Sequence, residues 1–500
     1  MQKTRTTISK ITFLITLVVV LMTLAAIIFP ALYHHSFGNY PDKLESQFEI
    51  GHQAYLIICG NIVIFAIGFA YYKNKIPFIG TKIDQIRQFE ISKKISVIIL
   101  IIILGTYVGF STPELFLDER EQWADYIILE EALEYWPGGE SKIPNPYIDE
   151  QLDRHVRLVL LDASVKIFQN IKILPFLASI LVVFFTYLLT VQLTGKRFAG
   201  IISMLVLLQS HIFLTFDTIA VYENFWVLFY IISLYAVRKK WVLSPFFYIL
   251  SIFTKAYAAP FFLMTLYSTY RSEIKTKKKY FVFASYLGII LIVFLIIFFG
   301  KSVYTDVIEI EYSRFFLGFA DTAMQFRYDI LFTIMLLPVT VGLYILSVFT
   351  KAYVAPFFLM TLYSTYRSEI KTKKKYFVFA SYLGIILIVF LIVFFGKSVY
   401  IDVIEIEYSR FFLGFADTAM QFRYDILFTI MLLPVTVGLY ILSKNNPNTD
   451  VIHSLLAGTI IFSPILIMFT YFYEILPYRF VPTLVFFSIG VAMFFSKKPK

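Results

Sequence analysis

Long apolar stretches recur along the chain and limit what it can fold into. A stretch of about 18 or more apolar residues is long enough to cross a hydrocarbon core of roughly 30 Å as a helix. Hydrophobic residues make up 59% of the 500 residues, and aromatic residues make up 19%. The stretches do not alternate apolar with polar residues, as the strands of a membrane barrel would. The sequence therefore predicts an all-α fold, a polytopic bundle of transmembrane helices.

The formal charge of +10 is gathered in short basic blocks between these stretches. The blocks are KNK at 73–75, SKK at 92–94, GKR at 195–197, RKK at 238–240, and KTKKK at 275–279 and again at 371–375. Lys and Arg are enriched in the cytoplasmic loops of membrane proteins, so this pattern indicates orientation rather than nucleic-acid binding. We expect a multi-pass protein of the cell membrane, in contact with membrane lipids and with no nucleic-acid partner.

Placing the basic blocks in the cytoplasm predicts the order of the membrane spans. We expect spans near 11–33, 54–72, 95–111, 171–193, 198–216, 219–237, a short pair across 241–270, then 280–300, 329–347, 451–471 and 479–495. The predicted parts are two N-terminal helices with a basic cytoplasmic loop (1–94), a transmembrane core (95–347), a duplicate of part of that core (348–443), and a C-terminal two-helix segment (444–500).

The duplicate is a tandem repeat, in which residues 252–347 return as residues 348–443 with a period of 96 residues. Only four positions differ between the copies. Functional repeats in transporters usually survive only as weak internal symmetry, so near identity indicates a recent duplication or an assembly artefact. The repeat also strains the topology, because residues 329–367 would have to make three short crossings. The sequence does not decide whether Lys255 or its copy Lys351 belongs to the core.

The loop at 112–170 is predicted to lie outside the cell. It holds 13 Asp and Glu against 5 Lys and Arg. Apolar residues at helical spacing predict two amphipathic helices in it, one through Trp123, Tyr126, Leu129, Leu133 and Trp136, the other through Leu152, Val156, Val159, Ala163 and Ile167. We expect these extracytoplasmic surface helices to lie at the outer interface. They either cover the bundle or shape a cleft, and the spacing alone leaves both interpretations open.

Asp118 and Glu119 open this loop directly after an apolar span. One interpretation is structural, with Asp118 as a helix N-cap and Glu121 as its partner three residues later. The other is chemical, because a carboxylate at the mouth of a bundle can be tuned toward general-base work by its low-dielectric surroundings. The local sequence supports both interpretations.

Several stretches beyond this loop carry a family resemblance. They are the hairpin-like segment 193–241, "SIFTKAYAAPFF" at 251–262 with its Thr-Lys helix break, and "PYRFVP" at 477–482. Together with the acidic pair and the amphipathic helices, they resemble the GT-C superfamily of membrane glycosyltransferases. The similarity is greatest to the branch of dolichyl-phosphate-mannose protein mannosyltransferases and aminoarabinose transferases. Residues 1–94 and the tandem repeat have no counterpart in that pattern.

The resemblance implies an inverting transfer of a sugar from a polyprenyl (dolichyl) phosphate to a protein, glycan or lipid acceptor on the outer face. An acidic residue of the first outer loop acts as the general base in that family. Carried onto this chain, Asp118 is the base, and Glu119 orients the acceptor or replaces Asp118. The family needs no nucleotide-sugar domain, and we expect no cofactor. The spacing of His, Cys and carboxylates predicts no metal site.

The leaving phosphate requires cations near the outer face, because negative charge develops there in the transition state. The candidates are Arg154, Arg157, Lys255 and Arg479 for the donor phosphate, with Asp217 and Glu223 for the sugar or the acceptor. Each also has a structural interpretation. The two arginines of the loop pair with acids on a solvated face, Lys255 reaches toward an interface, Arg479 pairs with Glu474, and the two acids form a polar turn.

Two other classes of protein stay open. A transporter or lipid flippase would use paired charges near the membrane midplane, and the predicted spans carry almost none. A non-catalytic assembly protein of the envelope would use the acidic loop only as a binding surface.

Overall fold

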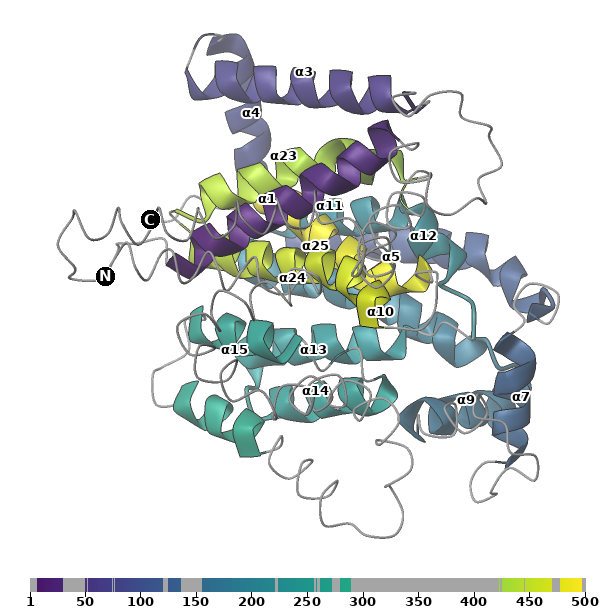
Figure 1. Ribbon diagram of the computed structural model, residues 1–500. Coiled ribbons are helices and arrows are strands. Elements are labelled where there is room, and N and C mark those ends of the chain that lie inside the picture. The colour runs from purple at the N-terminus through teal and green to yellow at the C-terminus, as the bar shows by residue number, and fades with distance from the viewer. Residues whose placement is uncertain are drawn as a thin grey trace, which may run out of the picture.

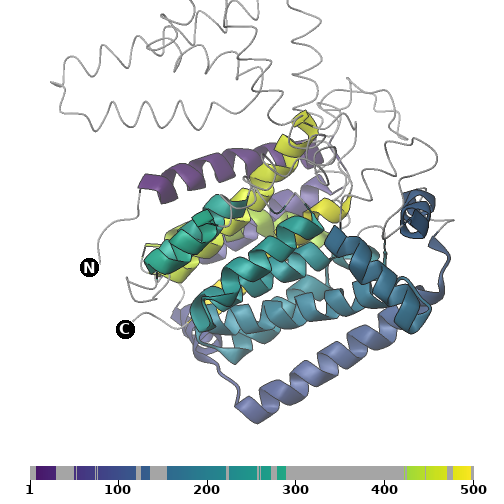
Figure 2. The same ribbon diagram turned by 90° about the horizontal axis from the view of Figure 1, so that it is seen from below.

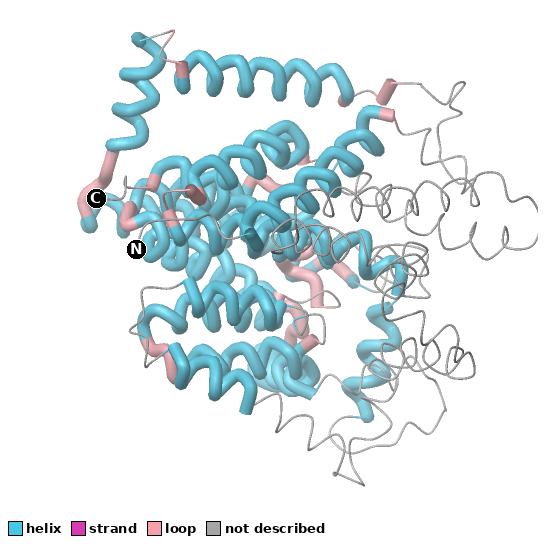
Figure 3. The backbone as a smooth tube through the Cα atoms, turned by 60° about the vertical axis from the view of Figure 1, so that its left-hand side comes forward, coloured by secondary structure: helices cyan, strands magenta, loops and turns pink. Residues whose placement is uncertain are grey.

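The computed structural model describes residues 7–29, 50–51, 53–73, 75, 77–119, 125–135, 155–220, 224–255, 258, 261–271, 279–288, 422, 425–444, 446–469 and 477–496. Every regular element within these residues is a helix (Figure 3), which confirms the all-α prediction for this part of the chain. The elements are α1 (Thr7–Ile28), α3 (Ala54–Tyr72), α4 (Pro77–Gln88), α5 (Lys93–Ser111), η1 (Thr112–Phe116), α7 (Asp125–Tyr135), α9 (His155–Phe168), α10 (Ile173–Thr194), α11 (Arg197–Leu208), α12 (His211–Thr215), α13 (Phe225–Lys239), α14 (Leu243–Thr254), α15 (Phe262–Arg271), α23 (Ile426–Leu442), α24 (Pro447–Phe469), η4 (Pro477–Phe480), α25 (Val481–Ala492) and η5 (Met493–Phe495).

Four helices are long and apolar enough to cross a membrane. They are Ser9–Ile28 in α1, Ala54–Tyr71 in α3, Lys93–Phe116 in α5 with η1, and Ile173–Thr194 in α10. Of these, α10 is 56% buried within the protein, whereas α3 and α5 are 17% buried. Figure 2 shows α5 along the edge of the bundle. Apolar helices that the protein itself leaves uncovered need a hydrocarbon solvent, so this finding supports the predicted membrane character.

The interior of the bundle is formed by α10, α11, α13 and α25, which pack side by side. Val183, Met204, Ile231 and Val485, one from each helix, are completely buried. Gly200 lets α11 approach α10 closely, because a Cβ atom at this position would lie 2.6 Å from the Tyr187 ring. Close-packed apolar contacts of this kind hold the bundle together and fix the ends of its helices.

The basic blocks around α13 and the buried carboxylates Glu119 and Asp217 mark opposite ends of the bundle. At one end, Arg238 donates to Asn448 at 2.8 Å, and Arg271 pairs with Asp450 at 3.1 Å. We call this the basic end. At the other end, α5 finishes and α10 and α13 begin, with Glu119 and Asp217 buried between them. We call this the carboxylate end. The separation agrees with the predicted orientation, in which basic loops share one side.

Two predicted spans are shorter in the structure than their hydropathy indicates. The span predicted at 198–216 is broken after Leu208, where the Ser210 hydroxyl accepts from Phe213 N at 3.2 Å and starts α12 as its N-cap. The span predicted at 219–237 begins only at Phe225. Residues 216–220 between these helices form a connection that carries the polar residues Asp217 and Thr218. The sequence predicted a break at 217–218 but not the length of the connection, because Phe216, Ile219 and Ala220 are as apolar as the helices beside it.

The described residues draw on both copies of the repeat. α15 belongs to the first copy, and α23 belongs to the second. The described residues between 252 and 288 and between 422 and 443 correspond to different parts of one 96-residue unit, so each described repeat position occurs only once in the bundle. The remaining positions of the repeat, including Lys351, lie outside the described residues.

Deleting residues 289–384 is therefore expected to preserve the bundle. The deletion removes 96 residues that lie outside the described part and leaves a chain of 404 residues. We expect the purified product to be monodisperse and to unfold within a few degrees of the full chain. Deletion of 348–443 is the matched control, because its product differs from the first only at two positions of the unit, Ile297/Val393 and Thr305/Ile401. Loss of folded protein in both deletions would show that two complete copies are required.

Candidate functional site

The loop that follows α5 is fastened to the segment between α9 and α10. Lys172 Nζ donates to the carbonyl oxygens of Glu114 at 3.2 Å and Leu117 at 2.7 Å. Asn170 Nδ2 donates to the carbonyl of Leu115 at 3.0 Å. These bonds satisfy carbonyls that the end of the helix leaves without intrahelical partners. They hold the following residues, Asp118 and Glu119, against the bundle.

The two acids of this loop lie in different surroundings. Asp118 is exposed, whereas Glu119 is 2% exposed. One Glu119 carboxylate oxygen accepts from the backbone N–H of Ala220, and the other has no hydrogen-bond partner among the described residues. The predicted capping partner Glu121 lies outside the described residues.

Burial raises the pKa of Glu119 from 4.5 to about 7. The Ala220 N–H, the Lys172 ammonium and the Arg157 guanidinium oppose this rise, and the neighbouring Asp118 carboxylate adds to it. Glu119 therefore exchanges a proton close to neutral pH, where a general base works best. Perturbed carboxylates of this kind cluster at functional sites.

Asp217 is the second buried carboxylate at this end, and it is completely inaccessible to solvent. It lies in the polar connection between α12 and α13, where it accepts from the Ser111 hydroxyl at 2.9 Å. Burial raises the pKa of Asp217 to about 7, the Tyr107 and Ser111 hydroxyls lower it, and the Glu114 carboxylate raises it further. Glu114 itself accepts from the Thr218 hydroxyl at 3.1 Å. The loop after α5 and the connection before α13 are thus joined by polar contacts.

The backbone of this connection is held by α10. Ser179 on α10 donates its hydroxyl to the carbonyl of Asp217 at 2.7 Å. Asn224 Nδ2 in turn donates to the Ser179 hydroxyl at 2.8 Å. Both side chains are buried, and hydrogen bonds in such surroundings are costly to break. The carboxylate of Asp217 is therefore rigidly placed by α5 and α10 together.

Two buried cations act on Glu119. Arg157 on α9 is 1% exposed and Lys172 is 4% exposed, and both lower the pKa of Glu119. The interpretation of Arg157 as part of a solvated face is therefore wrong, because α9 turns this residue inward together with Leu158 and Leu161. Val159 of the predicted apolar stripe is instead exposed. Arg154, which was predicted to bind phosphate together with Arg157, lies outside the described residues.

The other predicted cations lie at the same end of the bundle. Lys255 follows the last residue of α14 and is 5% exposed, and the Ser251 hydroxyl ties this end of α14 to the carbonyl of Trp226 at 2.7 Å. Arg479 is 8% exposed and lies in η4, which packs beside α12. The predicted role of each residue in binding the donor phosphate stays a hypothesis. Glu223 lies outside the described residues.

Sequence reasoning missed Lys172 and Glu114. Lys172 was not selected because it is the second residue of the span predicted at 171–193 and belongs to no motif. A signal was present, since a lone lysine between an acidic loop and an apolar span needs a counter-charge or polar partners. Its partners are backbone carbonyls from a segment 55 residues away, which no local pattern reveals.

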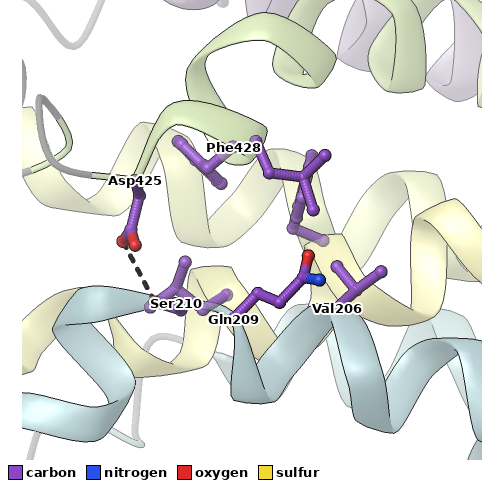
Figure 4. Close-up of a pocket in the computed structure, with 8 residues that line it drawn as sticks. Val206, Gln209, Ser210, Asp425 and Phe428 are labelled. Carbon is purple, nitrogen blue, oxygen red and sulfur yellow. Dashed lines mark hydrogen bonds between the residues drawn. The ribbon is translucent and has the colours of Figure 1, made fainter.

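A small pocket lies at the start of α12 and is shown in Figure 4. Its polar lining is Gln209, Ser210 and Asp425, and apolar side chains of α11, α23 and α25 form the rest. Asp425 accepts from the Ser210 hydroxyl at 3.0 Å and from the backbone N–H of His211. Burial raises its pKa, and these donors lower it. The carboxylate occupies the N-terminus of α12, where a negative charge is favourable, and so it fixes the helix that leads to Asp217.

Asp425→Ala is expected to lower the free energy of unfolding by about 1–2 kcal/mol, the usual cost of a lost helix cap. Thermal unfolding of the purified protein in lipid nanodiscs measures this change. The first copy of the repeat provides the matched control, because Asp329 has the same neighbours in sequence. We expect Asp329→Ala to change stability by less than about 0.5 kcal/mol. An equal loss in both variants would contradict the assignment of this cap to the second copy.

No family model matches the chain, and no curated protein or solved structure is significantly similar to it. The resemblance to GT-C glycosyltransferases therefore stays a prediction based on short motifs. The functional proposal therefore rests on the buried carboxylates and cations at the carboxylate end.

Proposed function

We propose that the protein is a membrane glycosyltransferase. It moves a sugar from a polyprenyl phosphate to a protein, glycan or lipid acceptor, with inversion at the anomeric carbon. The observation that carries the proposal is Glu119, a buried carboxylate with a pKa of about 7 at the end of an apolar bundle, close to the cations Lys172 and Arg157. A lipid-linked donor would reach this end from the membrane, and a polar acceptor would reach it from water.

The proposed reaction is a single displacement. A carboxylate takes the proton from the hydroxyl or amine of the acceptor, whose oxygen or nitrogen then bonds to the anomeric carbon. The bond between that carbon and the phosphate oxygen breaks, and the polyprenyl phosphate leaves with the electron pair. Preorganised cations stabilise the charge that develops on the phosphate. Lys172 and Arg157, which act electrostatically on Glu119, are candidates for this role, and Lys255 and Arg479 are further candidates at the same end.

Burial distinguishes the two candidates for the base. Asp118 is favoured by its position in the sequence, but it is exposed. Glu119 is shielded from water, and its pKa lies near the working pH of a base. We therefore assign proton abstraction to Glu119 and acceptor orientation to Asp118. Asp217, with its raised pKa, is proposed to hydrogen-bond sugar or acceptor hydroxyls.

The proposed active site faces the outside of the cell. The support is the arrangement of charge, because the basic residues that mark cytoplasmic loops lie at the opposite end of the bundle from Glu119 and Asp217. On this support we propose a multi-pass protein of the cell membrane with an extracytoplasmic site.

The function class is tested with purified protein in vesicles loaded with a polyprenyl-phosphate sugar and a mixture of peptide, glycan and lipid acceptors. A glycosyltransferase converts the donor to free polyprenyl phosphate and a glycosylated acceptor with inverted configuration. Movement of the intact donor across the vesicle membrane without transfer would instead identify a transporter or flippase. Binding of an acceptor without turnover of any donor would favour an assembly protein.

A further inference from the structure

α4 joins two helices that can cross the membrane. Short links, residues 73–76 and 89–92, connect it to α3 before it and α5 after it. Figures 1 and 3 show α4 running crosswise to α3, at the basic end of the bundle. A helix that turns sideways between two candidate spans is expected at the level where the hydrocarbon core ends, parallel to the membrane plane.

Polar contacts fasten one face of α4 to the bundle. The Tyr71 hydroxyl at the end of α3 donates to Asp84 at 2.8 Å, and Arg87 Nη1 donates to the same hydroxyl at 3.2 Å. Arg87 Nε also donates to the carbonyl of Phe494 in the C-terminal segment at 3.1 Å. Asp84 and Arg87 are thus engaged within the protein, and the orientation of α4 is fixed.

The opposite face of α4 combines apolar side chains with a cation. Phe78, Lys82 and Ile86 are four residues apart and so share this face, where Phe78 is 72% exposed and Ile86 is 51% exposed. Lys82 is exposed as well, and its ammonium lies 6.0 Å from the centre of the Phe78 ring. Such a face suits a membrane surface, where rings enter the headgroup region and a lysine reaches the phosphates.

Further lysines surround this face. Lys73 and Lys75 precede α4, and Lys93 and Lys94 follow it, and all four are exposed. The nearby acid Glu90 is paired with Arg197 at 3.7 Å. We infer that α4 is an interfacial helix that binds anionic phospholipid headgroups, with Lys82 and the four flanking lysines as the phosphate contacts. The inference is independent of the proposed catalytic function.

The test places a fluorophore on α4 of the full-length protein. The single native cysteine is removed by Cys59→Ser, and Gln85→Cys provides an exposed labelling position that keeps Phe78 and Lys82. The labelled protein is reconstituted in phosphatidylcholine vesicles that contain a trace of spin-labelled phosphatidylglycerol or of spin-labelled phosphatidylcholine. The ratio of the two quenching constants reports the preference of α4 for the anionic headgroup.

We expect phosphatidylglycerol to quench more strongly than phosphatidylcholine. Lys82→Gln should lower the preference about fivefold, the usual contribution of one lysine at an anionic membrane surface. Lys166→Gln is the matched control, because Lys166 is an exposed lysine on α9 at the other end of the bundle, and the ratio should not change. Equal quenching by the two lipids, or no quenching by either, would overturn the inference. An equal effect of the two substitutions would also overturn it.

Discussion

Glu119→Gln is expected to lower the rate of sugar transfer by about 10²- to 10⁴-fold, the range for a lost general base. Glutamine has the same size and keeps an oxygen that can accept from Ala220, but it cannot take a proton from the acceptor. Single-turnover transfer from a polyprenyl-phosphate sugar by the purified protein measures the loss. The donor should still bind, because the phosphate contacts are cations that the substitution leaves in place.

Two controls separate this loss from unfolding. The folded-state pKa of Glu119 is raised from 4.5 to about 7, so the stability that the protonated carboxyl provides is lost as pH rises through about 7. Glutamine does not ionise, and the variant should therefore be at least as stable as the wild type above that pH. Asp118→Asn changes the exposed neighbour and should lower transfer less than about tenfold. Loss of transfer in Asp118→Asn together with full activity in Glu119→Gln would instead make Asp118 the base.

Lys172→Met is expected to have the second-largest effect, and it should lower both the stability of the protein and the rate of sugar transfer. Removing the ammonium leaves two carbonyls of the loop after α5 without their donor, and hydrogen bonds from a charged group contribute about 1.5–3 kcal/mol to stability. If Lys172 also stabilises the leaving phosphate, transfer should fall by about 10²-fold or more. Thermal unfolding and single-turnover transfer separate the two contributions.

The same substitution should change the pH dependence of the remaining activity. The Lys172 ammonium lowers the pKa of Glu119, so its removal should raise that pKa. The base would then stay protonated to higher pH, and the acid limb of the pH–rate profile should move upward. Lys172→Arg keeps the charge and should leave the limb close to its original position. An unmoved limb in Lys172→Met would show that the lysine supports the loop without acting on the base.

Hydropathy predicted most of the helices correctly because they are apolar on every side. The spans expected at 54–72 and 171–193 coincide with α3 and α10 to within two residues. The errors lie where polar contacts override hydropathy. The break before α12 depends on Ser210 and on Asp425, which lies more than 200 residues later in the sequence. No local pattern could reveal that Asp425 supports this N-cap from such a distance.

The candidate site was predicted in part, because Asp118, Glu119, Arg157 and Asp217 were all selected from the sequence. The structure brings Glu119 and Arg157 close enough to influence each other, and it places Asp217 on the neighbouring connection. The sequence could not rank Asp118 against Glu119, since their difference in burial arises when the connection before α13 folds over the loop after α5. The hydrogen bonds from Lys172 to the Glu114 and Leu117 carbonyls could not be predicted either, because they also form only when distant segments fold together.

The pH–rate profile of transfer by the wild type, Asp118→Asn and Glu119→Gln tests the central claim most directly. With a buried Glu119 as the base, transfer by the wild type and by Asp118→Asn should rise as pH increases and level off above about 7. The residual rate of Glu119→Gln should lack this limb. A wild-type limb near pH 4, or a limb near pH 7 that persists in Glu119→Gln, would contradict the assignment of the base.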